Sequence, residues 1–208
     1  MGGGRHLRRL PDIPWAGDVS DPAVQRLWTD EGIEMRLPPG TEFNDPQPPL
    51  SNHFSNVFVY HAESKAVHND DCLCYYERPS KKMGLIVGAL IKHDTLAFHS
   101  SFTGSGLTDP SAFQNWLESL VDEWNFDILC TAHNGTLCGN ASSRVRKLLE
   151  ESRDIFAKLS SRQELIRQGT LVPTEEEKAK GAWSPGGASL SKLKTDTSAS
   201  ELVCYECG

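Results

Sequence analysis

The stretch FSNVFVYHAESKAVHNDDCLCYY, residues 54–76, decides the fold, because it is typical of two strands joined by a short turn. In its first part Val57 and Val59 alternate with Phe58 and Tyr60, so apolar side chains fall on both faces of one strand. This pattern predicts an interior strand of a layered sheet, buried on both sides. The polar AESK that follows is typical of a turn, and AVHN then returns as the second strand of a hairpin.

An acidic pair follows the second strand directly. Asp70 and Asp71 are therefore expected at an edge of the sheet, where adjacent carboxylates are costly beside a core unless a positive charge lies near them. Three interpretations are open at this point. The two aspartates cap and solvate a turn, they lie beside a thiol site made by Cys72 and Cys74, or they form part of a metal site.

A helix, a strand and a second helix follow later in the chain. DPSAFQNWLESLVDEW, residues 109–124, repeats apolar side chains every three or four positions behind an Asp-Pro start, which predicts a helix. The apolar FDILCTA, residues 126–132, predicts a short buried strand, and His133-Asn134-Gly135 predicts a turn at its carboxyl end. A second helix is expected at about 141–159 and a short one, capped by Asp21, at 22–28.

These elements predict an α/β fold in one main domain. The proline-rich residues 1–49 are expected to be mostly an irregular connecting segment, and residues 50–168 to form the core. The apolar segment 84–98 is ambiguous between strand and helix. Residues 169–208 contain too little apolar surface to offset the loss of chain entropy, so we expect a flexible tail.

Composition and charge exclude several classes of partner. With 208 residues and 38% hydrophobic content the chain is long enough for a packed core. A net charge of −7 argues against nucleic acid as a partner. No apolar run approaches the roughly 18 to 20 residues of a membrane span.

The start MGGGRHLRRLPDIPW lacks the apolar segment of a secretory signal, so we expect reduced cysteines in the cytoplasm or an organelle stroma.

The order strand, acidic turn, helix, strand, AHNG and helix resembles the second half of a metallo-β-lactamase-fold protein. In that superfamily one metal-binding histidine precedes a strand hairpin, a bridging aspartate follows the second strand, and a last histidine follows a later strand. Here His53 in SNHFSNVFVYH, Asp71 in NDDCL and His133 in TAHNG match those three positions. The resemblance extends over about residues 50–160 and implies the carboxyl-terminal portion of a layered αββα sandwich.

The resemblance also implies a chemistry. His53, Asp71 and His133 would hold one or two ions of zinc or iron, because such ions take neutral imidazole and carboxylate ligands. A metal-bound hydroxide would then attack an ester, thioester or amide in a small-molecule substrate, with Asp71 and His133 as the catalytic residues. His68 and Asp70 would support the site from behind by orienting a ligand.

The chain departs from the superfamily in one respect, because the His-x-His-x-Asp-His run of the first half is absent. This favours the alternative of a non-catalytic binding or scaffold protein that keeps the fold and has lost its metal. For His53, an ordinary hydrogen-bonded histidine is the simpler alternative. A third hypothesis is a thiol switch or zinc clip that includes Cys204 and Cys207. A half-domain with an uncovered sheet would also be expected to form homo-oligomers or to misfold.

Overall fold

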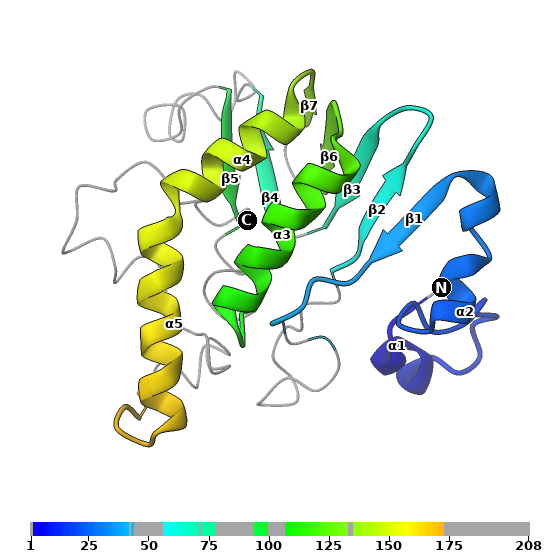
Figure 1. The fold of residues 1–208 in the computed structure, drawn as a ribbon. Helices are drawn as coiled ribbons and strands as arrows, with labels where there is room; N and C mark the ends of the chain where they lie inside the picture. Colours follow the sequence, from blue (N-terminus) through cyan, green and yellow to red (C-terminus); the bar gives the residue numbers. More distant parts are fainter. Residues whose placement is uncertain are drawn as a thin grey trace, which may run out of the picture.

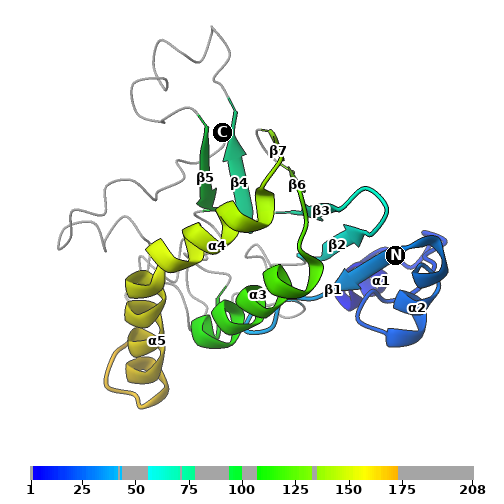
Figure 2. The same ribbon diagram turned by 45° about the horizontal axis from the view of Figure 1, so that its top comes forward.

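The fold was obtained as a computed structural model. It describes residues 2–41, 43, 56–70, 72–77, 94–99, 107–132 and 135–172. These residues form a mixed α/β fold, as the sequence predicts. The helices at 110–124 and 141–151 lie over one face of a five-stranded sheet, and a second sheet of two strands lies beside it (Figures 1 and 2).

The larger sheet has the strand order β1-β2-β3-β6-β7. The strands are Ile33–Arg36 (β1), Phe58–His61 (β2), Ala66–Asn69 (β3), Ile128–Thr131 (β6) and Thr136–Cys138 (β7). Neighbouring strands are antiparallel except β3 and β6, which run parallel. A parallel pair needs a long crossover connection, and helix α3 (Pro110–Trp124) lies in the chain that joins these two strands.

The predicted hairpin is confirmed. Strands β2 and β3 pair with Tyr60 opposite Val67, and residues 62–65 form the turn between them. Lys65 closes this turn in the left-handed region, with a φ of 50°. The polar composition of AESK and the alternation in both strands are local signals, which is why this part of the fold could be read from the sequence.

Strand β2 is buried on only one face. Phe58 and Tyr60 are buried, whereas Val57 and Val59 are half-buried. The prediction that both faces would be buried was therefore wrong for this strand. Helix α3 covers the face that carries Phe58 and Tyr60, which its two tryptophans contact (Figure 1). The side chains on the other face stay partly exposed.

Helix α3 begins and packs as its sequence predicts. The Asp109 carboxylate accepts a hydrogen bond from the Ala112 backbone N–H at 3.0 Å, which satisfies one of the free donors at the helix start. Trp116 packs edge-on against Phe58 of β2, with the ring centroids 5.2 Å apart. The largest fully buried side chains of the core are Phe58, Phe113, Phe126, Phe156, Leu73, Leu107, Leu117, Leu120, Leu129, Leu149 and Leu159.

Two helices replace the single helix predicted at 141–159. Helix α4 covers Ala141–Glu151 and helix α5 covers Arg153–Arg167. The break falls at the buried Ser152, whose φ of −96° and ψ of 0° leave the helical region. The change of direction is visible in Figure 2, and it keeps Phe156 and Leu159 in the core while α5 extends away from the sheet.

Strands β4 (Leu73–Tyr76) and β5 (Thr95–Phe98) form the smaller sheet. Strand β4 does not continue the hairpin strand β3, because the two strands belong to different sheets. The Asn69 side chain accepts a hydrogen bond from the Leu73 backbone, so the chain turns between the two strands. The end of the ambiguous segment 84–98 is strand β5, and residues 78–93 lie outside the described residues.

The amino-terminal segment 1–49 contains more structure than an irregular connection. It forms α1 (Gly4–Arg9), α2 (Pro22–Arg26) and the 3-10 helix η1 (Thr29–Glu31) before it enters β1. The Asp21 carboxylate caps α2, as predicted, through the Ala23 backbone N–H. Strand β1 was not predicted, because its sequence IEMR mixes charged and apolar residues without a clear period.

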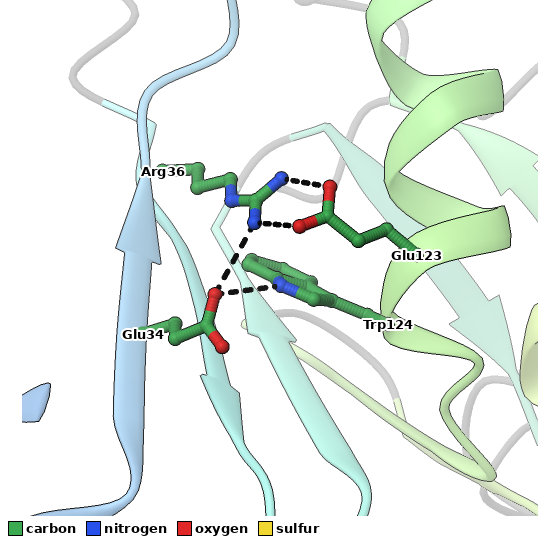
Figure 3. A network of polar contacts seen from close by, with 4 residues as sticks. All are labelled: Glu34, Arg36, Glu123 and Trp124. Carbon is green, nitrogen blue, oxygen red and sulfur yellow. Dashed lines mark hydrogen bonds and ion pairs between the residues drawn. The ribbon is translucent and has the colours of Figure 1, made fainter.

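A polar cluster joins β1 to the end of α3 (Figure 3). The Arg36 guanidinium donates to both carboxylate oxygens of Glu123, at 2.6 and 2.5 Å, and from Nη2 to Glu34 at 3.2 Å. The Trp124 indole N–H donates to the same Glu34 oxygen at 3.1 Å. The guanidinium also lies 5.0 Å from the centroid of the Trp124 ring, which stacks on Tyr60. Its hydrogen bonds to Glu123 lower the pKa of that carboxyl group.

None of the helices in the described ranges is both long and apolar enough to span a bilayer. Helix α5 ends at Arg167, close to the start of the predicted tail. Of that tail the structure describes only residues 169–172, and residues 173–208 lie outside the described residues.

Candidate functional site

Three strand ends meet at one edge of the five-stranded sheet. The hairpin turn joins β2 and β3 at the other end of these strands, so β2 begins where β3 ends. Strand β6 runs parallel to β3, and the last residues of the two strands, Asn69 and Thr131, are partners in register. We call this the site edge and define it by Asn56, Asn69 and Thr131. Side chains on turns at such an edge can converge while the sheet holds them rigidly.

The three predicted metal ligands lie in the segments that join this edge, but outside the described residues. His53 precedes Asn56 at the start of β2. Asp71 comes shortly after Asn69, and His133 comes shortly after Thr131. The topology therefore brings together the strand ends next to all three. Whether the three side chains share an ion stays a prediction.

Two turns at the site edge are each closed by a hydrogen bond between a side chain and the backbone. The Asn69 Oδ1 accepts a hydrogen bond from the Leu73 backbone N–H at 2.7 Å. The Thr131 hydroxyl donates to the Gly135 carbonyl oxygen at 2.8 Å. In each case the last residue of a strand binds the residue four positions later. The two closed turns leave the sheet side by side, because Asn69 and Thr131 are register partners.

Two buried asparagines at this edge each have one polar atom without a hydrogen-bond partner among the described residues. Asn69 is 0% exposed and its Nδ2 has no acceptor, while Asn56 is 2% exposed and its Oδ1 has no donor. An unsatisfied buried polar group costs about 1–3 kcal/mol, so a fold keeps few of them. Asn56 and Asn69 flank, in the sequence, the segments that contain His53 and Asp71, and they are the clearest polar feature of the site edge.

Gly135 brings the second turn against strand β4. A Cβ atom added at this glycine would lie 3.1 Å from the Tyr75 carbonyl oxygen and 3.1 Å from the Cβ atom of Glu77. A side chain at this position would therefore push the turn away from the strand. The backbone contact links the turn that precedes β7 to the smaller sheet.

A buried histidine lies next to the first turn. His99 follows β5 and is 8% exposed, and its backbone N–H donates to the Cys72 carbonyl oxygen at 2.9 Å. This bond places the backbone of His99 next to the end of the turn that follows β3. His99 was not among the predicted site residues. The available signal was a histidine directly after a short apolar strand, the same pattern that singled out His133.

A charged cluster holds the smaller sheet to helix α4. The Tyr75 hydroxyl and the Arg144 guanidinium each donate to the Asp94 carboxylate at 2.6 Å. The hydrogen bond from Tyr75, followed by the one from Arg144, lowers the pKa of the Asp94 carboxyl group. The same bond to Asp94, followed by burial, raises the pKa of the Tyr75 hydroxyl. The cluster fixes the strand against which Gly135 packs.

The two residues predicted to orient the ligands, His68 and Asp70, are exposed. His68 is paired with Val59 and Cys130 and points to the face opposite Asn69.

Within the described ranges no three His, Cys, Asp or Glu side chains are grouped closely enough to hold a metal ion. None of the four cysteines in those ranges forms a disulfide, and Cys204 and Cys207 lie outside them.

No protein-family model matches the sequence, and a comparison with curated proteins finds no match. A functional assignment therefore depends on the residues of this chain alone. The features that bear on it are the strand ends, the two closed turns and the buried amides of the site edge.

Proposed function

We propose that the chain is a metal-dependent hydrolase of the metallo-β-lactamase type, with its metal site at the site edge. The observation that carries this proposal is the register pairing of Asn69 with Thr131. It makes the turns that contain Asp71 and His133 leave two adjacent parallel strands at the same level. The αββα sandwich of that superfamily is part of the proposal, and the mixed α/β fold supports it at the level of fold class.

The residues at this edge fit a metal of the zinc or iron type. Two imidazoles and one carboxylate, from His53, His133 and Asp71, are ligands that these ions accept. The buried amides of Asn56 and Asn69 each offer a hydrogen-bonding atom that has no partner among the described residues. Orienting groups of that kind commonly surround metal ligands.

When bound, such an ion polarises a carbonyl group and lowers the pKa of water, so that a nucleophile forms near neutral pH. The chain itself would provide the ligands, two of them from the segments that the two closed turns span. The Asp71 carboxylate and the His133 imidazole would hold the ion from adjacent turns, and His53 would approach from the start of β2. The substrate would be an ester, a thioester or an amide.

Metal-linked stability tests the proposal. The metal-free protein is titrated with Zn²⁺, Fe²⁺ and Mn²⁺ while its thermal unfolding is followed. At one hundred times the dissociation constant a bound ion should raise Tm by about 5–10 °C. The variants Asp71→Ala and His133→Ala should lose this increase.

The chain offers matched controls at the other end of the same strands. His61 ends β2 beside the hairpin turn, and the exposed Asp127 precedes β6. His61→Ala and Asp127→Ala should keep the full increase in Tm. The proposal is wrong if none of the three ions changes the Tm of the wild-type protein, or if the control variants lose the effect equally.

A non-catalytic binding protein of the same fold is the second candidate, and the absent His-x-His-x-Asp-His run favours it. The two candidates differ in turnover. A metal-loaded hydrolase cleaves at least one member of a panel of simple esters, thioesters and amides, and loses this activity in Asp71→Ala. A protein that binds no metal and cleaves none of them is the scaffold.

A further inference from the structure

Two cysteines share the face of the five-stranded sheet that is turned away from helix α3. Cys130 of β6 comes directly after Leu129. Cys138 of β7 comes directly after Leu137, which is the register partner of Leu129. Both leucines are buried in the core. Because side chains alternate across a strand, the two thiols point to the opposite face, which we call the far face and define by Cys130 and Cys138. Cys130 is half-buried there and Cys138 is exposed.

His68 brings an imidazole next to only one of these thiols. Cys130 is the register partner of His68 on the parallel strand β3 and of Thr136 on β7. Cys138 is instead the register partner of Ile128. Neighbouring strands lie about 4.8 Å apart, and register partners share a face. The exposed His68 side chain therefore stands beside Cys130, whereas the neighbour of Cys138 on β6 is apolar.

An imidazole beside a thiol favours the reactive form of cysteine. The thiolate, and not the thiol, attacks a disulfide, and a neighbouring positive charge stabilises the thiolate. A protonated imidazole about 5 Å away favours the thiolate over the thiol by a factor of about four in water. No hydrogen bond joins His68 to Cys130 in the structure, so the exposed imidazole approaches the sulfur by rotation about its own side-chain bonds.

We propose that Cys130 is a site of thiol–disulfide exchange with small disulfides of the glutathione type, and that His68 promotes the exchange. The Cys130 thiolate attacks one sulfur of the disulfide, and the S–S bond of the disulfide breaks. A new S–S bond joins Cys130 to one half of the disulfide, and the other half leaves as a thiolate that takes up the proton lost by Cys130. The cysteine is oxidised and the leaving half is reduced. This inference does not depend on the proposed function.

Competition between the two thiols of one protein molecule tests the proposal. The metal-free full chain is incubated with oxidised glutathione at about pH 6.5, where about half of ordinary histidine side chains are protonated. Peptide mass spectrometry then gives the rate at which each cysteine gains glutathione. Cys138 is the internal standard, because it lies on the same face and is the more exposed thiol. The ratio of the Cys130 rate to the Cys138 rate should fall about 2- to 4-fold in His68→Ala.

Further substitutions separate the charge of His68 from its shape. His68→Lys keeps a positive charge and should keep the ratio within about twofold of wild type, whereas His68→Glu should lower it below the value in His68→Ala. A purely structural role of this side chain would make both variants lose equally. His61→Ala is the matched control, because His61 lies on the same face but pairs with Ala66, outside the row of Cys130. It should leave the ratio unchanged, and circular dichroism confirms that each variant is folded.

Three results would overturn the proposal. In the first, Cys138 gains glutathione while Cys130 stays unmodified. In the second, the ratio of the two rates is the same in wild type and in His68→Ala. In the third, His68→Lys and His68→Glu lower the ratio by the same factor, which would assign the effect to shape and not to charge. Because the test uses metal-free protein, its outcome is separate from that of the metal titrations.

Discussion

The polar cluster between β1 and α3 allows a quantitative prediction about Arg36→Ala. The Arg36 side chain is 31% exposed and Glu123 is 56% exposed, so water screens the pair and its net contribution is at most about 1 kcal/mol. The guanidinium over the Trp124 ring adds about 0.5–1 kcal/mol. We therefore expect Arg36→Ala to lower the free energy of unfolding by about 1–2 kcal/mol, and Tm by about 2–8 °C.

A double-mutant cycle isolates the ion pair itself. Arg36→Ala, Glu123→Ala and the double variant are unfolded by heat or urea, and the coupling free energy should be about 0.5–1 kcal/mol. Arg146 and Asp122 form the matched pair on α4 and α3, joined by one hydrogen bond of 2.6 Å between side chains that are 45% and 71% exposed. Their coupling should be close to zero. Equal coupling in the two pairs would refute the reasoning.

The pH dependence has a definite sign. Hydrogen bonding to Arg36 lowers the pKa of Glu123 in the folded protein, so the charged carboxylate is favoured on folding. This contribution is fully present above the ordinary glutamate pKa of about 4.3 and is lost as the pH falls through the lower folded-state value. The stability difference between wild type and Arg36→Ala should therefore shrink at about pH 3. A difference that grows on acidification would contradict the assignment.

Two further predictions concern backbone strain and the Tyr75 cluster. Gly40 has a φ of 68°, and a Cβ atom there would overlap the Asp109 carbonyl oxygen, so Gly40→Ala should cost more than about 2 kcal/mol in thermal or urea unfolding. Gly32, with a φ of 72° and open space around it, provides the control: Gly32→Ala should cost clearly less, and equal losses would exclude the overlap as the cause. Tyr75→Phe removes the hydrogen bond to Asp94, and its destabilisation in urea should be largest between about pH 5 and 9. The difference from wild type should decline as the pH falls through the lowered pKa of Asp94, where the carboxylate takes up a proton. It should also decline as the pH rises through the raised pKa of Tyr75, where the hydroxyl loses its proton. A loss of stability that does not change with pH would contradict this role.

Local signals account for the parts of the fold that the sequence predicts. Asp109 followed by a proline marks the start of α3, and the polar turn at 62–65 marks the hairpin, because capping and turn chemistry depend on a few neighbouring residues. Strand β1 depends instead on pairing with β2, and the break between α4 and α5 depends on packing around Ser152. Neither leaves a clear pattern in its own segment.

The same distinction applies to the site edge. The turns after β3 and β6 were predicted as positions for ligands, because histidine and aspartate directly after apolar strands stand out in the sequence. Asn56, Asn69 and His99 were not selected. Asparagine is common in turns, and a buried amide with an unsatisfied atom becomes visible only when strands far apart in the sequence are placed together.

Diffraction from crystals of the zinc-loaded protein, measured at the zinc absorption edge, tests the proposed metal site most directly. We predict an anomalous peak at the site edge, with the His53 and His133 imidazole nitrogens and an Asp71 carboxylate oxygen about 2.0–2.2 Å from the ion. No peak at this edge, or electron density that shows the three side chains too far apart to share one ion, would contradict the proposal.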